Sequence, residues 1–234
     1  MINIVGTDDQ VTVLNLFKSS QYHLGGFRFS DGATLTLDEL AASNPVYNVI
    51  SGNESDNTLT GVLGNNVISG GAGNDVLNGQ SKTDQLLGEA GDDYLYGNGG
   101  NDYLEGGDGS DIYYFATNGG ADIINNQSST SDNQDVLQLS GIEEENLWFT
   151  RYGDHLLIDV IGSDDQITVQ DWFNSDAQKL DEIRTGDSVL LANKVESLVS
   201  AMAAFGAPPA GGADLSKEVR DEITPVITAS WQAA

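Results

Sequence analysis

The stretch Gly70 to Asn78, GGAGNDVLN, decides the fold because its order of glycine, acidic and aliphatic residues recurs along the chain. Counted in steps of nine, a glycine returns in seven consecutive copies without a slip. The first positions of the copies are Gly52, Gly61, Gly70, Gly79, Gly88, Gly97 and Gly106. Such a fixed period indicates a repeat architecture in which each copy is one small structural unit.

Two other positions of each copy keep their chemical character. The sixth position holds an acid or an amide, namely Asn57, Asn66, Asp75, Asp84, Asp93, Asp102 and Asp111. The eighth holds an apolar or aromatic residue, namely Leu59, Ile68, Leu77, Leu86, Leu95, Leu104 and Tyr113. Glycines at the first, second and fourth positions allow a tight turn with positive φ. The residues around the eighth position suffice for a very short strand, so one copy predicts one turn and one strand.

We expect a mainly β fold, in which two copies complete one turn of a right-handed parallel β-roll with the eighth-position side chains in a thin core. Each aspartate then lies above the equivalent residue two copies away, at one strand spacing of about 4.7 to 4.9 Å. The stacked pairs are Asp75 with Asp93, Asp84 with Asp102, and Asp93 with Asp111. Two carboxylates this close repel each other by about 3 kcal/mol at an effective dielectric constant near 20.

A hard divalent cation between successive turns reverses the sign of that interaction. The glycine-rich turns would add backbone carbonyls to an oxygen-only shell, which selects Ca²⁺ over Zn²⁺ and over the geometrically stricter Mg²⁺. We therefore predict several Ca²⁺ ions held by Asp75, Asp84, Asp93, Asp102 and Asp111. The glycines expected at these sites are Gly70, Gly71, Gly73, Gly88, Gly91, Gly97, Gly99, Gly100, Gly106, Gly107 and Gly109.

The copies are unequal, which predicts unequal sites. The copy that begins at Gly79 has Gln80 and Lys82 at its second and fourth positions, where the other side of the roll keeps more glycines, and Lys82 adds a positive charge. We expect better Ca²⁺ sites at Asp75/Asp93 and Asp93/Asp111 than at Asp84/Asp102.

The amide residues at the beginning of the array predict weaker sites. Asn57 and Asn66 can offer an uncharged amide oxygen, so the Asn57/Asp75 and Asn66/Asp84 sites should be weaker or empty. At the other end, residues 119–123 and 135–137 continue the repeat in degenerate form, and Asp122 extends the ion ladder.

The seven copies resemble the glycine- and aspartate-rich nonapeptides of RTX (repeats-in-toxin) proteins, whose pattern is G-G-x-G-x-D-x-U-x. Seven copies in strict register make this resemblance specific, whereas one copy alone would fit any turn. The alternative is a metal-free, glycine-rich solenoid.

An internal duplication flanks the array. Residues 2–17 return at 158–173 with eight identities in sixteen. Around the second copy, the sequence predicts a hairpin of two strands, 147–152 and 155–158, with its turn at Gly153 and Asp154. A third strand is predicted at 167–169. These flanks resemble the calcium-binding-related segments beside RTX arrays, which implies caps with Trp148, Phe149, Trp172 and Phe173 as core residues. Carbohydrate stacking is the alternative role for these aromatics.

The expected domains are a partial flanking segment at 1–46, the roll at 47–126, a β cap at 127–192, and a helix, a linker and a tail at 193–234. The sequence matches a capping box at Asn193 to Glu196, which predicts that a helix begins there and ends near Phe205. The RTX resemblance implies that roughly residues 190–234 carry the uncleaved signal for a type I ABC exporter. Because the first duplicated copy starts in the middle of its module, we expect a C-terminal piece of a longer protein.

Composition restricts the partners and the location. A net charge of −27 argues against nucleic acids and anionic membranes as partners, and the absence of cysteine excludes disulfides and thiolate metal sites. No apolar run approaches the roughly 20 residues of a membrane span, and no N-terminal signal is recognisable. The resemblance implies a secreted or cell-surface location reached by type I export.

No catalytic motif is present, and we expect that this chain is not an enzyme. Asp154 and His155 are expected to form a surface pair rather than a catalytic dyad. The predicted function is a calcium-binding module that folds outside the cell and supports secretion of a larger protein. The alternatives are an adhesin module that binds a glycan or a cell surface, and the C-terminal part of a secreted hydrolase or toxin.

Overall fold

The structure, a computed structural model, describes residues 47–129, 133–208 and 213–233, together with four two-residue strands nearer the N-terminus. The chain divides into two compact units, Met1–Val46 and Tyr47–Ala234. In the first unit β1 (Ile2–Asn3) pairs with β2 (Gln10–Val11), and β3 (Phe27–Arg28) with β4 (Thr34–Leu35), both antiparallel. The rest of the predicted flanking segment lies outside the described residues.

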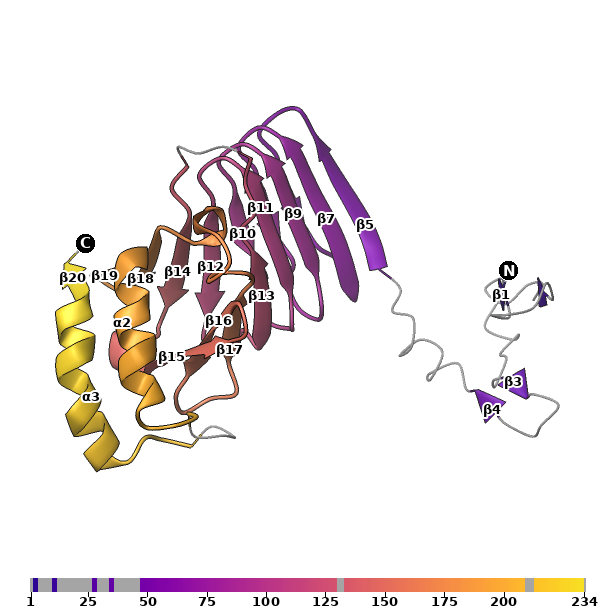
Figure 1. Cartoon of the computed structure of the whole chain (residues 1–234). Coiled ribbons are helices and arrows are strands. Elements are labelled where there is room, and N and C mark those ends of the chain that lie inside the picture. The colour runs from indigo at the N-terminus through magenta and orange to yellow at the C-terminus, as the bar shows by residue number, and fades with distance from the viewer. Residues whose placement is uncertain are drawn as a thin grey trace. The chain divides into compact units, whose positions relative to one another are not determined.

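Two eight-stranded sheets form the second unit (Figure 1). The first sheet contains, in spatial order, β15 (Leu147–Tyr152), β16 (His155–Val160), β17 (Gln166–Val169), β13 (Ala121–Asn125), β11 (Tyr103–Asp108), β9 (Gln85–Ala90), β7 (Asn65–Ala72) and β5 (Tyr47–Asn53). The second contains β20 (Trp231–Ala233), β19 (Ser188–Leu191), β18 (Glu182–Thr185), β14 (Val136–Ser140), β12 (Ile112–Ala116), β10 (Tyr94–Tyr96), β8 (Val76–Asn78) and β6 (Thr58–Thr60). Successive repeats thus alternate between the two sheets.

The predicted register, in which every strand pairs with the strand two copies away, is present. Leu77 pairs with Leu95 and then Tyr113 in the second sheet, and Ile68 pairs with Leu86 in the first, all in parallel strands. These side chains form the buried ladder between the sheets, so the fold is the predicted mainly β, parallel β-roll. The eighth-position residues exposed by 1% or less are Ile68, Leu77, Leu86, Leu95, Leu104 and Tyr113.

The two sheets differ in strand length. In the second sheet the strands β6, β8 and β10 are three residues long, as predicted, whereas β7, β9 and β11 in the first continue into the glycine-rich turns. Positive φ occurs at the second and fourth positions of the copies even where glycine is absent, as at Gln80, Lys82 and Glu89. The turn geometry is therefore imposed by the stacking and not by glycine alone.

Both sheets continue without a break into the C-terminal part of the chain. The parallel strands β14, β17 and β18 lie beyond residue 126, so the roll and the cap share their sheets. The predicted hairpin is present as β15 and β16 around Gly153 and Asp154, and β17 joins it antiparallel. Two short 3₁₀ helices, Glu144–Asn146 and Asp176–Gln178, lie in the connections.

The duplicated segments share their strand pairing as well as their sequence. In the first copy Ile2 pairs with Val11 and Asn3 with Gln10. The residues 156 positions later, Ile158 with Ile167 and Asp159 with Gln166, are also paired antiparallel. The described residues of the first copy therefore have the same antiparallel register as their counterparts in the second copy.

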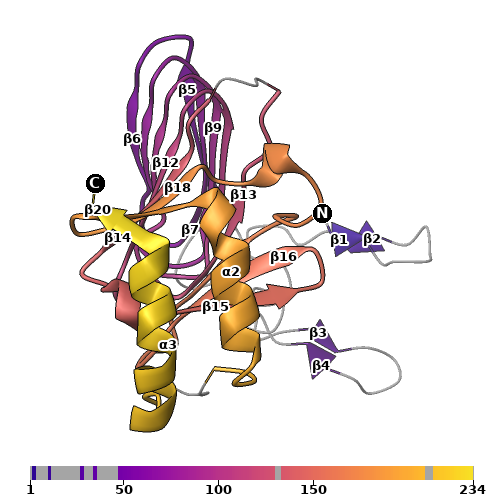
Figure 2. The ribbon, with the colours of Figure 1, turned by 60° about the vertical axis from the view of Figure 1, so that its left-hand side comes forward.

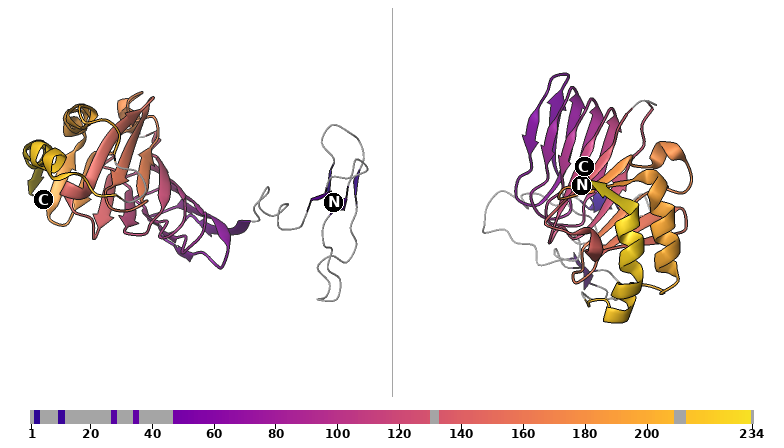
Figure 3. Two further views of the ribbon diagram at one scale, coloured as in Figure 1. Left: turned by 90° about the horizontal axis from the view of Figure 1, so that it is seen from below. Right: turned by 90° about the vertical axis from the view of Figure 1, so that its left-hand side faces the viewer.

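Helices cover the C-terminal end of the roll (Figure 2). Helix α2 (Ala192–Ala203) packs on β15, and α3 (Lys217–Ser230) packs beside α2, so the helices lie at the end of the first sheet opposite to β5 (Figure 3). The predicted capping box is wrong, because the N-cap is Leu191 and Asn193 lies inside the helix. The chain then returns as β20, which pairs with β19. No helix in the described part of the chain has the length and apolar character needed to cross a membrane.

The cap aromatics belong to the core. Trp148, Phe149 and Trp172 are exposed by 2% or less, so they are not available to a carbohydrate. Phe173 is partly buried, and the Arg151 guanidinium lies 4.5 Å from the centre of its ring. The core of the roll and the core of the cap form one continuous cluster.

Candidate metal centre

Two columns of polar side chains run along the roll at the turns. The first column precedes the strands β6, β8, β10, β12 and β14 and consists of Asn57, Asp75, Asp93, Asp111 and Asp135. The second lies at the beginning of β7, β9, β11 and β13 and consists of Asn66, Asp84, Asp102 and Asp122. From Asn66 to Asp135 the members are exposed by 2% or less, so carboxylates are stacked out of contact with water.

One oxygen of each carboxylate is held by the backbone of the turn before it. The Asp75 N–H donates to Asp93 Oδ1 at 2.7 Å, and the Asp93 N–H donates to Asp111 Oδ1 at 3.0 Å. In the second column the Asp84 N–H donates to Asp102 Oδ1 at 2.8 Å. The structure thus brings together all three predicted pairs.

The second oxygen of these carboxylates has no such partner. Oδ2 is buried and accepts no hydrogen bond from any described residue in Asp75, Asp84, Asp93, Asp102 and Asp122. A buried carboxylate oxygen without a donor costs several kcal/mol unless a cation or a proton neutralises it. Five such oxygens in two columns indicate a ligand that is positively charged.

Burial also shifts the titration of the columns. It raises the pKa of Asp93 and Asp102 to about 6, of Asp111 to about 7 and of Asp122 to about 8. The pKa values of Asp84 and Asp135 move in the same direction for the same reason. The cause is desolvation of the charged form, to which neighbouring carboxylates add repulsion. A bound cation removes both penalties.

Backbone carbonyls complete the surroundings of the unpartnered oxygens. The side of Gly88 that lacks a side chain faces Asp93 Oδ2 and the Gly106 carbonyl oxygen, and Gly79 faces Asp84 Oδ2 and the Gly97 carbonyl in the same way. Among the described residues no cluster of three or more His, Cys, Asp or Glu side chains occurs, so carbonyls must supply part of any shell. Mixed carboxylate and carbonyl oxygens suit Ca²⁺ and do not suit Zn²⁺. The residues present therefore fit calcium.

Four of the eleven glycines predicted at the sites, those at the first position of their copies, have their open side against an Oδ2 atom of the columns. A Cβ on Gly70, Gly97 or Gly106 would collide with the carboxylate oxygens of Asp75, Asp102 or Asp111, respectively. Gly99 differs, because an added Cβ would meet only the Asn118 carbonyl, so its open side faces away from the columns. Those glycines with positive φ at the second and fourth positions are Gly71, Gly73, Gly91, Gly100, Gly107 and Gly109.

This contrast predicts the outcome of two alanine substitutions. Gly88→Ala should remove one bound calcium ion and destabilise the roll by about 1 to 3 kcal/mol, because the methyl group would occupy the space between Asp93 Oδ2 and the Gly106 carbonyl. Gly99→Ala is the matched control, since neither glycine has positive φ and the new Cβ lies 3.5 Å from the nearest oxygen. Calorimetric calcium titration gives the stoichiometry, and equal values for the two variants would contradict the prediction.

The copy with Gln80 and Lys82 is strained, as well as poor in glycine. Their φ values are 81° and 83°, a left-handed conformation that costs a non-glycine residue about 1 to 2 kcal/mol. The copy of Asp93 contains one such residue, Glu89, with a φ of 80°, so two strained residues against one support the prediction that the Asp84/Asp102 site is weaker than the sites of the first column. The strain is a second reason, next to the charge of Lys82.

Lys82→Gly should therefore stabilise the calcium-loaded chain by about 0.5 to 1 kcal/mol, because relief of the left-handed strain exceeds the entropy cost of glycine. Lys82→Gln keeps the strain and removes the charge, and its effect should be smaller because the side chain is exposed. Thermal unfolding in excess calcium measures both. A larger gain for the glutamine variant would show that charge, not backbone conformation, limits this site.

The columns continue further than the repeat. The Asp102 N–H donates to Asp122 Oδ1 at 2.9 Å, which places Asp122 below Asp102 as expected. The Asp111 N–H donates to Asp135 Oδ1 at 2.9 Å, so Asp135 belongs to the first column, although sequence reasoning did not assign it there. Its Oδ2 accepts the amide groups of Asn126 and Asn133, at 2.9 and 2.7 Å. The signal was present in the degenerate copy at 135–137, but the longer spacing between Asp111 and Asp135 hid it.

Asp154 and His155 do not face each other. The Arg151 guanidinium lies 3.7 Å from the Asp154 carboxylate, whereas His155 Nδ1 accepts the Asp171 N–H at 3.0 Å. Asp154 is mostly exposed. This geometry gives no support to a catalytic dyad.

Comparisons with known proteins agree with this geometry. The model of the RTX calcium-binding nonapeptide repeat family (4 copies) matches residues 51–86 and 79–113. The model of the haemolysin-type calcium binding protein related domain matches 1–39 and 155–194, the two duplicated segments. A similar curated protein is the iron-regulated protein FrpA of Neisseria meningitidis serogroup C, 34% identical over 83 residues. The match covers 34% of this chain and 7% of that relative.

Proposed function

Because this chain belongs to the RTX calcium-binding proteins and binds calcium at several sites, we propose that it is a folding module of a secreted protein, unfolded inside the cell and folded by calcium outside it. The observation that supports this most is the row of buried Asp Oδ2 atoms that accept no hydrogen bond from the described residues. Such a row opposes folding at the low free calcium of a cytosol. It favours folding at the range of roughly 10⁻⁴ to 10⁻³ M typical of extracellular calcium modules.

The acidic columns act as the switch in this proposal. While ionised and unneutralised, Asp93 and its neighbours two copies away repel each other and keep their turns apart. Calcium, when bound, supplies the positive charge that the carboxylates and carbonyls lack. The backbone N–H groups of the columns can then donate to Oδ1 of the next turn, and the Leu77–Leu95 ladder closes.

The C-terminal tail would be read by a type I ABC exporter before the module folds. In the folded chain β20 is paired with β19, and Trp231 is exposed by only 8%, so this part of the tail is engaged in the cap. The exporter would therefore encounter a free tail only in the unfolded chain. Folding outside would then oppose sliding back. The relative extends far beyond the matched region, which supports a larger exported protein as the one that this module serves.

Secretion of the full chain from a bacterium carrying a type I exporter tests the proposal. The intact chain and a variant lacking residues 1–46 should reach the medium, whereas a variant lacking 213–234 should remain inside the cell. The two deletions are matched controls because each removes a terminal segment and leaves the columns intact. Retention of all three, or export of the variant without the tail, would contradict a role for this tail in export.

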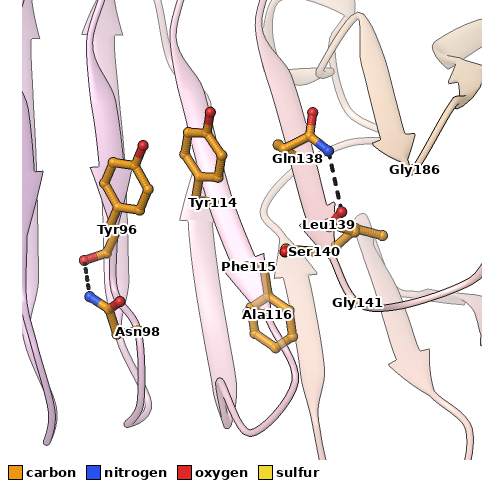
Figure 4. A pocket seen from close by; sticks show the side chains of 10 residues that line it. All are labelled: Tyr96, Asn98, Tyr114, Phe115, Ala116, Gln138, Leu139, Ser140, Gly141 and Gly186. Atoms are coloured by element: carbon orange, nitrogen blue, oxygen red, sulfur yellow. Dashed lines mark hydrogen bonds between the residues drawn. The ribbon is translucent and has the colours of Figure 1, made fainter. Parts of the chain in front are cut away.

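A second candidate function is glycan binding, which a hollow on the outer face of the second sheet favours. The hollow has a volume of about 570 Å³ and is lined by Tyr96, Tyr114, Asn98 and Gln138, among others (Figure 4). The Tyr96 and Tyr114 rings are stacked with centres 4.3 Å apart, and Gln138 follows Tyr114 in the same cross-strand row. Aromatic rings beside amide side chains suit a neutral oligosaccharide, and the negative charge of the chain disfavours anionic ones.

A glycan array probed with and without calcium tests this second function. Binding should require calcium and should be lost in Tyr114→Ala, since that ring borders the hollow. Tyr152→Ala is the control, because Tyr152 is 69% exposed and does not line the hollow. Equal binding by both variants, or none by the native chain, would contradict glycan recognition here without affecting the proposed role in folding.

A further inference from the structure

The amide nitrogen of Asn66 lies at the centre of four oxygen atoms. Nδ2 donates to the carbonyl oxygens of Val62 at 3.1 Å, Gly64 at 3.0 Å and Gly79 at 3.3 Å, and to Asp84 Oδ1 at 2.8 Å. We call these four atoms the Asn66 oxygen cage. An amide has two N–H bonds for four acceptors, so the cage offers more oxygens than the amide can satisfy. Such an arrangement matches the shell of a hard cation better than that of an amide.

The sequence positions that form the cage recur in the other copies. The carbonyls of Val62, Gly64 and Gly79 belong to the second and fourth positions of one copy and to the first position two copies on. The open side of Gly61 faces Asn66 Nδ2 and the Gly79 carbonyl. The open side of Gly88, the first position of a later copy, faces Asp93 Oδ2 and the Gly106 carbonyl. A nitrogen with two protons thus takes the place, at Asn66, of an unpartnered carboxylate oxygen.

The orientation of the Asn66 amide is fixed from its other side. Asn66 Oδ1 accepts the Val62 N–H at 3.0 Å and Asn48 Nδ2 at 3.4 Å. Turning the amide over would place the nitrogen against these donors and the oxygen against four acceptors. The expectation of an amide oxygen directed at the ion is therefore wrong for Asn66.

The first column begins differently. Asn57 Oδ1 accepts the Asn53 N–H at 2.8 Å, and the open side of Gly52 faces this oxygen and the Gly70 carbonyl. At Asn57 an oxygen therefore faces the column, as expected from the sequence. At Asn66, by contrast, the open side of the first-position glycine, Gly61, faces the amide nitrogen.

We propose that the Asn66 amide stands in for a calcium ion, so that the second column closes at Asn66 and the aspartates below it define its metal sites. This inference rests on calcium binding by the columns. The donated protons neutralise the cage permanently, and the turn that contains Asn66 needs no ion. It follows that Asn66→Asp converts the cage into an additional calcium site.

Calcium stoichiometry of the full chain, measured by equilibrium dialysis and by calorimetry, tests this inference. Asn66→Asp should bind one more ion per chain than the native protein. Asn65→Asp is the matched control, because it adds the same charge at the adjacent residue, which lies outside the cage, and it should leave the number unchanged. An unchanged number in Asn66→Asp, or a gain in both variants, would overturn the proposal.

A second measurement keeps the test independent of how the variant folds. A crystal of the native chain grown with calcium should show anomalous density between Asp84 and Asp102 and none inside the Asn66 oxygen cage. Calcium density inside that cage would overturn the proposal. If the native chain bound no calcium at all, the proposed function would fail, and the Asn66 amide would simply be a structural hydrogen-bond donor.

Discussion

Removal of calcium is expected to abolish most of the β-sheet signal of this chain in far-UV circular dichroism, and titration with calcium should restore it cooperatively. In EDTA each stacked pair of ionised carboxylates opposes folding by about 3 kcal/mol at an effective dielectric constant near 20. Each calcium site stabilises the folded chain by about 2.7 kcal/mol when the free calcium concentration is one hundred times the dissociation constant of that site. Several sites along one thin core therefore decide whether the roll forms.

The same titration with magnesium is the control. Magnesium demands a regular octahedral shell, which turns that differ in residue and backbone angle from copy to copy do not offer. We expect little recovery of β signal at equal concentrations of magnesium. A chain that is fully β in EDTA and indifferent to calcium would contradict the switch and leave a metal-free solenoid.

Asp93→Asn should raise the calcium concentration at the folding midpoint by about tenfold or more, which corresponds to about 1.4 kcal/mol or more. Asp93 is shared by two stacked pairs, because Oδ1 accepts the Asp75 N–H and its own N–H donates to Asp111. An amide at this position carries no charge, whether it presents its nitrogen, as Asn66 does, or its oxygen, as Asn57 does in the same column as Asp93. The variant should therefore lose one ion outright and weaken another.

The matched control for this substitution is Asp92→Asn. It removes the same charge from the neighbouring residue, which is exposed and whose Oδ1 accepts the Ser110 N–H at 2.8 Å. We expect its midpoint to change little, because an amide oxygen can keep that hydrogen bond. Equal shifts in the two variants would show that net charge, rather than the buried position of Asp93, controls folding.

The regular part of the roll could be predicted because two constraints coincide in each copy. The sixth-position acid and the eighth-position aliphatic residue each recur at nine, so the stacking of Asp75 on Asp93 follows from spacing alone. Parallel pairing then places Leu77 against Leu95. Where both signals persist, sequence and structure agree residue by residue.

Other features of the fold and the site could not be predicted, because the spacing of the repeat changes there or because the sequence carries no local signal for them. Tyr103 pairs with Ile123 and Ile112 with Val136, at offsets longer than two copies, because strand pairing tolerates extra residues in the turns. The orientation of the Asn66 amide depends on donors from Val62 and Asn48, which no pattern reveals. Strand β20 forms because it pairs with β19, and the mildly amphipathic sequence at the C-terminus does not reveal this pairing.

Because the copies alternate between the two sheets, the regular part of the roll can change in length only by two copies at a time. Deleting the length of two copies from the regular part, such as 75–92, would rejoin Asn74 to Asp93 with every later strand still in its own sheet. Deleting the length of a single copy would move each later copy to the opposite sheet, and the hairpin β15–β16 would extend the wrong one. Lineages of such chains should therefore lengthen and shorten by paired copies, with the cap retained unchanged as the fixed end.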